Sequence, residues 1–261
     1  MDTPQHHSQS GKGLAIATLA AILATLATNT LSNRFPPGGQ NVGEIANTLL
    51  EGVLITPANY AFSIWGLIYL GLITYGLYQF NRERRRTPHI QQVNKLLIAA
   101  CIAQVIWIFL FSLKQFGWSI LAMLGILIPL IGIYLILDIG RERVSRQRRW
   151  MAHIPLSTYL SWIAVATIVN VASALYASNW GGFGISSTTW TVAMLVVAAL
   201  VAAVVIYQRQ DVAFTLVFVW AFVAIAMRHG DIPVIRWAAL ILAGLLLVGL
   251  AWAHYSLPKR A

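Results

Sequence analysis

Charged residues are scarce in this sequence. Only 10% of its 261 residues are Asp, Glu, Lys or Arg, whereas 58% are hydrophobic. Too few polar side chains are present to cover a water-soluble globule of this size, so the composition excludes an ordinary soluble domain. Apolar runs recur almost from end to end with short loops between them. This pattern predicts an all-α integral membrane protein.

Cysteine is almost absent, and ionisable side chains are missing from the centres of the apolar runs. The single cysteine, Cys101, excludes a disulfide framework or a cysteine-based metal motif within one chain. Acidic residues and histidines fall in tails, loops and turns or at the ends of runs. Proton-coupled carriers, hydrolases and metal enzymes need such groups brought together in a site. We therefore expect no catalytic residues, no metal site, no required cofactor and no enzymatic activity.

Eight apolar runs are candidates for membrane-spanning helices, and the seventh is the shortest. The first can also be interpreted as a signal peptide, but its length and its single preceding Lys12 favour a retained helix. Residues 32–55 contain several Pro and Gly residues and are expected to form a long external loop. The predicted spans are residues 13–31, 56–80, 93–113, 118–139, 154–177, 188–207, 212–227 and 234–254. A polar cytoplasmic tail, residues 1–12, is expected before them.

Arginine is concentrated in two short loops, residues 82–86 and 141–149, which follow the second and fourth spans. Basic loops stay on the cytoplasmic side, so both termini are predicted to be cytoplasmic, in a multi-pass protein of the inner or plasma membrane. Arg228 and Arg236 do not fit this pattern. The formal charge of +10 is better explained by contact with the lipid bilayer than by nucleic acid, which we do not expect as a partner.

Tryptophan is abundant, with ten residues in the chain. Four of them, Trp65, Trp107, Trp162 and Trp220, are predicted to lie deep in the membrane, where an indole N–H needs an acceptor. Helical spacing groups aromatic and polar side chains into three stripes. These stripes can join helices or can line a flat-walled pocket for a planar apolar ligand. They are Trp65 with Tyr69, Gln104 with Trp107, and Tyr159 with Trp162, Ala166 and Asn170.

Three segments resemble motifs of the TspO/MBR, or tryptophan-rich sensory protein, family. They are residues 56–69 (TPANYAFSIWGLIY), residues 159–170 (YLSWIAVATIVN) and residues 104–107 (QVIW). The resemblance covers five helices, residues 13–177, and residues 188–254 form a three-helix extension beyond it. It implies a five-helix bundle with a pocket for porphyrins or other hydrophobic ligands beneath the first loop. The ligand-binding residues implied by position are Pro57, Trp65, Tyr69, Gln104, Trp107, Trp162, Ala166 and Asn170.

The resemblance favours a membrane receptor or sensor for a planar hydrophobic ligand such as a tetrapyrrole. The alternative is a transporter of porphyrin-like or other amphipathic small molecules. The sequence leaves open the ligand, the role of the last three helices and the oligomeric state, for which a homodimer is one possibility.

Overall fold

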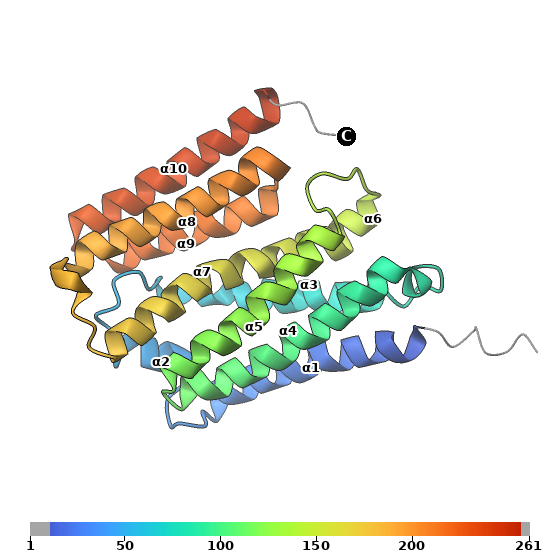
Figure 1. Cartoon of the computed structure of the whole chain (residues 1–261), viewed down its shortest axis with the longest axis horizontal. Helices are drawn as coiled ribbons and strands as arrows, with labels where there is room; N and C mark the ends of the chain where they lie inside the picture. Colours follow the sequence, from blue (N-terminus) through green and yellow to red (C-terminus); the bar gives the residue numbers. More distant parts are fainter. Residues whose placement is uncertain (1–10, 257–261) are drawn as a thin grey trace, which may run out of the picture.

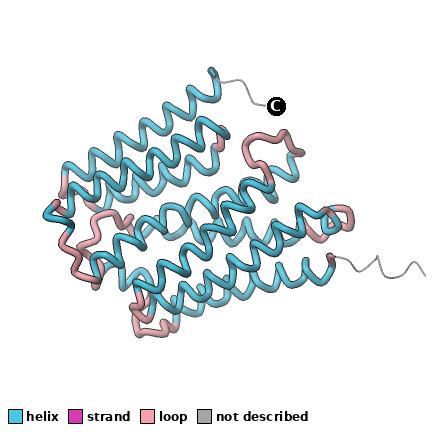
Figure 2. The backbone as a smooth tube through the Cα atoms, viewed as in Figure 1, coloured by secondary structure: helices cyan, strands magenta, loops and turns pink. Residues whose placement is uncertain are grey.

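The computed structural model of the chain describes residues 11–256, and these residues are helical almost throughout (Figure 2). They contain no strand, in agreement with the all-α prediction. Most of the expected tail at residues 1–12 lies outside this range, as do Lys259 and Arg260, the basic residues that follow the last predicted span. The helices are α1 (Lys12–Arg34), α2 (Val42–Asn47), α3 (Ile64–Tyr78), α4 (Pro88–Ser112), α5 (Phe116–Ile136), α6 (Arg146–Arg148), α7 (Ile154–Ala177), α8 (Ser187–Arg209), α9 (Val212–Arg228) and α10 (Pro233–Ser256).

The long helices form two groups (Figure 1). In the first group, α1, α4, α5, α7 and α3 pack in that order around a ring, and α3 closes it against α1. In the second group, α8, α9 and α10 pack against one another. Contact between the groups runs chiefly between α9 and α7. The predicted bundle and its three-helix extension are therefore joined along one helix of each.

Within residues 11–256, seven helical segments are long and apolar enough to cross a membrane, and α9 is the shorter eighth, as predicted. With 17 residues, α9 is about 25 Å long, less than a bilayer core of about 30 Å. It packs against α7, α8 and α10. Its short length is tolerated because other helices, rather than lipid, surround much of it.

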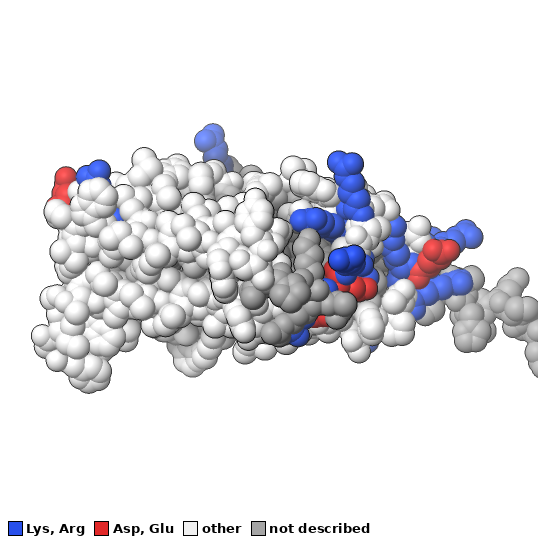
Figure 3. All heavy atoms as spheres, turned by 90° about the horizontal axis from the view of Figure 1, so that it is seen from above, with Lys and Arg blue, Asp and Glu red and all other residues white. Residues whose placement is uncertain are grey.

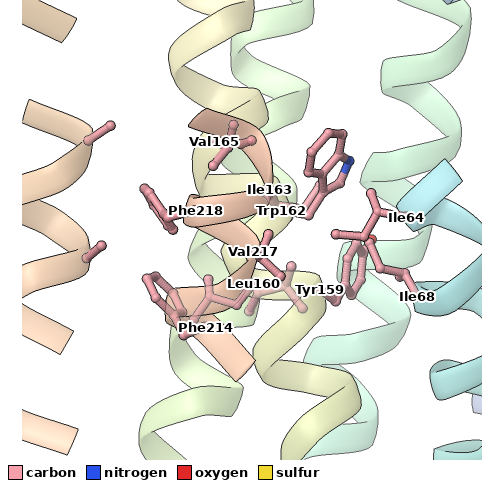
Figure 4. Close-up of a cluster of buried hydrophobic side chains, with 14 of the residues drawn as sticks. Ile64, Ile68, Tyr159, Leu160, Trp162, Ile163, Val165, Phe214, Val217 and Phe218 are labelled. Carbon is pink, nitrogen blue, oxygen red and sulfur yellow. The ribbon is translucent and has the colours of Figure 1, made fainter. Parts of the chain in front are cut away.

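Helix α7 is buried on two sides. On the side facing α3, Tyr159 and Trp162 pack near Ile64 and Ile68, while Phe218 of α9 lies on the other side (Figure 4). Tyr159 and Trp162 are only 1% and 3% exposed. This helix therefore forms a common wall for the five-helix bundle and the extension.

The segment expected to be a loop at residues 32–55 is partly helical. Helix α1 continues to Arg34, and α2 forms a short additional helix. A reciprocal capping box explains where α2 begins. The Glu44 backbone N–H donates to the Asn41 side chain at 2.9 Å, and the Asn41 N–H donates to the Glu44 carboxylate at 2.7 Å.

Basic side chains gather at one end of the molecule (Figure 3). Both predicted arginine loops lie at this end, together with the first residues of α1 and the end of α8. We call it the arginine-rich end; the opposite end carries α2 and the loop between α7 and α8. The membrane-spanning surface between the two ends is almost free of charge, as a bilayer requires.

A buried carboxylate joins the two helix groups at the arginine-rich end. Asp211 is 7% exposed and accepts hydrogen bonds from the Tyr134 hydroxyl at 2.8 Å and the Ser157 hydroxyl at 2.6 Å. It also caps α9 by accepting from the Phe214 N–H at 3.2 Å. The sequence identified Asp211 only as a turn residue. The structure makes it the shared acceptor of α5, α7 and α9.

An ion pair lies close to Asp211. The Asp138 carboxylate pairs with the buried Arg209 guanidinium at 3.1 Å. Arg209 also donates to the Ile139 carbonyl at 2.9 Å. The end of α8 crosses the turn after α5 so closely that a Cβ on Gly140, at φ +87°, would lie 2.3 Å from the Arg209 carbonyl oxygen. Glycine is needed there for both the backbone angle and the close approach.

Replacing Asp211 by alanine should destabilise the contact between the bundle and the extension. The Tyr134 and Ser157 hydroxyls lose their common acceptor and α9 loses its cap, at a cost of about 2–4 kcal/mol. We expect the thermal unfolding midpoint in detergent to fall by several degrees. Asp231→Ala, at an exposed carboxylate, is the control. Equal midpoints for the two variants would show that the buried carboxylate contributes no stability.

Candidate functional site

A cavity of about 440 Å³ lies inside the five-helix ring, beneath α2. Residues of α1, α3, α4, α5 and α7 form its walls, and residues from 41 to 59 cover it. Its volume falls in the range of about 300–1,000 Å³ that is usual for small-molecule sites. Apolar side chains are the majority in the lining, and they are joined by seven amide side chains, three hydroxyls and the Glu44 carboxylate. Such a cavity suits a ligand with an apolar body and several polar atoms.

Seven of the eight residues predicted as ligand-binding line this cavity: Pro57, Trp65, Gln104, Trp107, Trp162, Ala166 and Asn170. Tyr69 is the eighth and lies outside the lining. Its ring stacks on Trp65 with 5.5 Å between centroids, and its hydroxyl accepts a hydrogen bond from the Asn29 side chain at 2.8 Å. Tyr69 therefore packs against the Trp65 indole without lining the cavity itself. Contact of any of these residues with a ligand remains a prediction.

Asn170 is the polar centre of the α7 wall. Its side-chain oxygen accepts hydrogen bonds from the Trp107 indole N–H at 3.0 Å and the Ser119 hydroxyl at 3.1 Å. An indole nitrogen can only donate, so the amide oxygen must face Trp107. The Asn170 NH₂ group is then left buried with no partner among the described residues. A buried donor of this kind carries an energetic cost that a ligand acceptor can remove.

Aromatic rings also contact one another around the cavity. Trp162 meets Phe62 edge to face at 6.0 Å, and Trp65 meets Tyr159 at 6.1 Å. The Tyr159 hydroxyl reaches the Gln104 side-chain oxygen at 3.4 Å. The polar residues of the stripes therefore do join helices, and the same stripes also line the cavity. The stripes therefore combine contacts between helices with the lining of a cavity, and a planar ligand in that cavity stays a prediction.

Arg228 binds the cover of the cavity, residues 41–59, to the extension. This guanidinium, at the end of α9, donates to the Asn47 side-chain oxygen at 2.7 Å and to the Ala46 carbonyl at 3.0 Å. A main-chain group of the cover also meets α9 nearby, because the Ala58 N–H donates to the Ala224 carbonyl at 3.1 Å. In the sequence, Arg228 did not fit the predicted concentration of basic residues on the cytoplasmic side. Its position is explained by the carbonyl groups that it binds at the end of α2.

His229 follows Arg228 and holds the same segment. Its Nε2 lies 3.3 Å from the Thr56 carbonyl oxygen. Burial lowers the pKa of His229, the bond to Thr56 opposes this, and the positive charge of Arg228 lowers the pKa further. The ring is therefore neutral at pH 7 and can donate its Nε2–H to the carbonyl.

The helical stripes identified the walls of the cavity but not its cover. Val42, Ala46 and Leu50 reach the lining from α2 and the turn after it, a segment expected to be irregular. The Asn41-x-x-Glu44 spacing is the signal that could have revealed this helix. No sequence signal relates α2 to Arg228, since the contact spans 181 residues.

A family model described as "TSPO-like protein" matches residues 15–252 of the chain. The matched region includes both the five-helix ring and nearly all of the extension. No curated protein and no solved structure matches the chain.

Replacing Arg228 by alanine should loosen the cover without unfolding the bundle. Hydrogen bonds from a charged donor contribute about 1.5–3 kcal/mol, so hydrogen–deuterium exchange at the α2 amides should accelerate at least about tenfold. Exchange in α4 and α5 should stay unchanged.

Arg236→Ala is the matched control, because Arg236 lies at the same end but contacts the Trp237 ring rather than α2. If the α2 amides exchanged at the wild-type rate in Arg228→Ala, the cover would not depend on this contact.

Proposed function

The chain belongs to the TSPO-like protein family, and from this premise we propose that it is a membrane receptor or sensor, without enzymatic activity, that binds a planar hydrophobic ligand in the tryptophan-lined cavity. The ligand class that we propose is a tetrapyrrole such as a porphyrin. One observation carries the proposal: the buried Asn170 NH₂ group has no hydrogen-bond partner among the described residues and belongs to a largely apolar wall that includes Trp162.

The chemistry of the lining supports a flat ligand. Indole rings provide large apolar surfaces that bind other aromatic systems by offset stacking or edge contacts, each contributing about 0.5–1.5 kcal/mol beyond area burial. Burial of the ligand's apolar surface contributes most of the free energy, at about 25 cal/mol per Å². A carbonyl or carboxylate oxygen on the ligand can accept from Asn170. The aromatic walls then provide affinity, and the amide selects the orientation.

Tryptophan fluorescence tests this site. Protoporphyrin titrated into the purified protein should quench emission saturably, and Trp65→Phe and Trp162→Phe should each weaken binding about fivefold, the effect of losing one aromatic contact. Trp237→Phe is the matched control, because Trp237 is 57% exposed on α10 and lies outside the lining. Saturable quenching with unchanged affinity in both cavity variants would place the ligand elsewhere.

Transport of the same ligand is the alternative function. Porphyrin flux into proteoliposomes separates the two, because a receptor binds the ligand but leaves the internal concentration unchanged. If ligand flux occurred and depended on Trp65 and Trp162, the protein would be a carrier rather than a receptor.

We also propose that the arginine-rich end faces the cytoplasm of a cell whose inner or plasma membrane holds the protein. Retention of short basic loops on that side supports this orientation. A cysteine placed at Arg146, on the exposed α6, in a Cys101→Ser background should resist a membrane-impermeant maleimide in intact cells, whereas one at exposed Phe183 should react. The reverse labelling pattern would invert the topology.

A further inference from the structure

A second hollow lies outside the five-helix ring, at the arginine-rich end. It is a groove of about 1190 Å³ between the bundle and the extension. Its walls come from α3, α7 and α9. Its mouth is formed by residues 139–144, by Arg149, Trp150 and His153, and by the turn between α8 and α9. Its lining shares no residue with the tryptophan-lined cavity.

The part of the groove within the membrane span is apolar and open. Leu67 of α3 and Leu216 and Trp220 of α9 line it and are 60%, 47% and 37% exposed. From Val212 to Trp220, α9 rises about 12 Å, most of one leaflet of a hydrocarbon core about 30 Å thick. An acyl chain that entered from this leaflet would find a matching length of apolar surface.

The mouth of the groove has an excess of positive charge. Arg141, Arg143 and Arg149 line it, and none of the three has an ion pair within the described chain. The two carboxylates of the lining are already engaged, since Glu142 pairs with Arg148 at 3.0 Å and Asp211 accepts the hydrogen bonds described above. The charge at the mouth therefore favours an anion.

His153 provides independent evidence for a ligand at this mouth. It lines the groove, its side chain is 5% exposed, and its Nε2 is buried without a hydrogen-bond partner in the described structure. A π-helical turn, Arg149–His153, carries it into α7 together with Arg149. Single π-turns are rare and are often found at functional sites.

We propose that this groove binds an anionic glycerophospholipid from the leaflet at the arginine-rich end. The headgroup phosphate lies among Arg141, Arg149 and His153, and one acyl chain follows Leu67, Leu216 and Trp220. A lipid is the occupant that matches both halves, because the charged mouth and the lipid-facing apolar walls form one continuous hollow. The site is independent of the ligand proposed for the tryptophan-lined cavity.

Selective lipid retention by the full-length protein tests the proposal. The protein is reconstituted with equal amounts of phosphatidylglycerol and phosphatidylcholine, extracted in mild detergent, and its bound lipids are identified by native mass spectrometry. Wild type should retain phosphatidylglycerol over phosphatidylcholine by about fivefold or more, the scale of one basic side chain next to an anionic lipid. The double variant Arg149→Gln/His153→Gln should retain the two lipids in nearly equal amounts.

Arg146→Gln is the matched control, because Arg146 is exposed in the same basic segment but does not line the groove. A thermal unfolding midpoint equal to that of the wild type shows that the double variant is folded. Equal retention of the two lipids by wild type would overturn the proposal, as would an excess that survives the double substitution.

The apolar half is tested separately. Leu216→Trp and, from the opposite wall, Leu67→Trp should reduce phosphatidylglycerol retention at least threefold by filling the groove. Leu245→Trp adds the same ring to an exposed position of α10 outside the lining and should leave phosphatidylglycerol retention unchanged. Retention unaffected by both groove variants would contradict an acyl chain in this position.

Inorganic phosphate distinguishes a lipid from a free anion. Calorimetric titration of phosphate into delipidated protein should give no saturable binding, because the proposed site needs the acyl chain for affinity. Saturable phosphate binding that depends on Arg149 and persists in Leu216→Trp would overturn the lipid in favour of a free-anion site.

Discussion

The structure depends on a constraint that the bilayer imposes: a polar group within the apolar span must find its partner inside the protein. Helix α7 meets this constraint in two directions. Toward α9, Ser157 donates to Asp211 and Ser161 donates to the Phe214 carbonyl at 2.7 Å. Toward α4 and α5, the Asn170 oxygen accepts from Trp107 and Ser119. The polar side chains of one helix thus align the bundle, the extension and the cavity wall.

The same constraint gives the cavity its chemical character. Trp107 and Ser119 use the oxygen of Asn170, and its NH₂ group has no partner among the described residues. In the proposed receptor this donor makes the site selective, because an apolar ligand without an acceptor leaves it unpaired. The proposed orientation of a tetrapyrrole follows from this single amide.

The extension contributes to the cavity without lining it. Arg228 and His229 hold the segment that covers the cavity, and the Trp220 indole donates to the Ala61 carbonyl at 3.2 Å just beyond it. A five-helix bundle alone would leave this cover attached only through its own chain ends and its contacts with the ring. The three additional helices therefore couple the cover to α7, and through α7 to the cavity wall. The groove proposed to bind lipid lies along this same junction.

The sequence by itself determined the number and approximate bounds of the spanning helices, because a bilayer requires long apolar runs whatever their neighbours are. It also placed both arginine loops at one end and identified seven lining residues from helical spacing and motif resemblance. It did not distinguish the lipid-facing side of a helix from its packed side, since lipid is as apolar as a protein core. The partners of Asp211 and Arg228 were decided only by tertiary structure. Their contacts join helices far apart in the chain, and a residue at the end of a helix has no sequence pattern that shows whether it meets water or a neighbouring backbone.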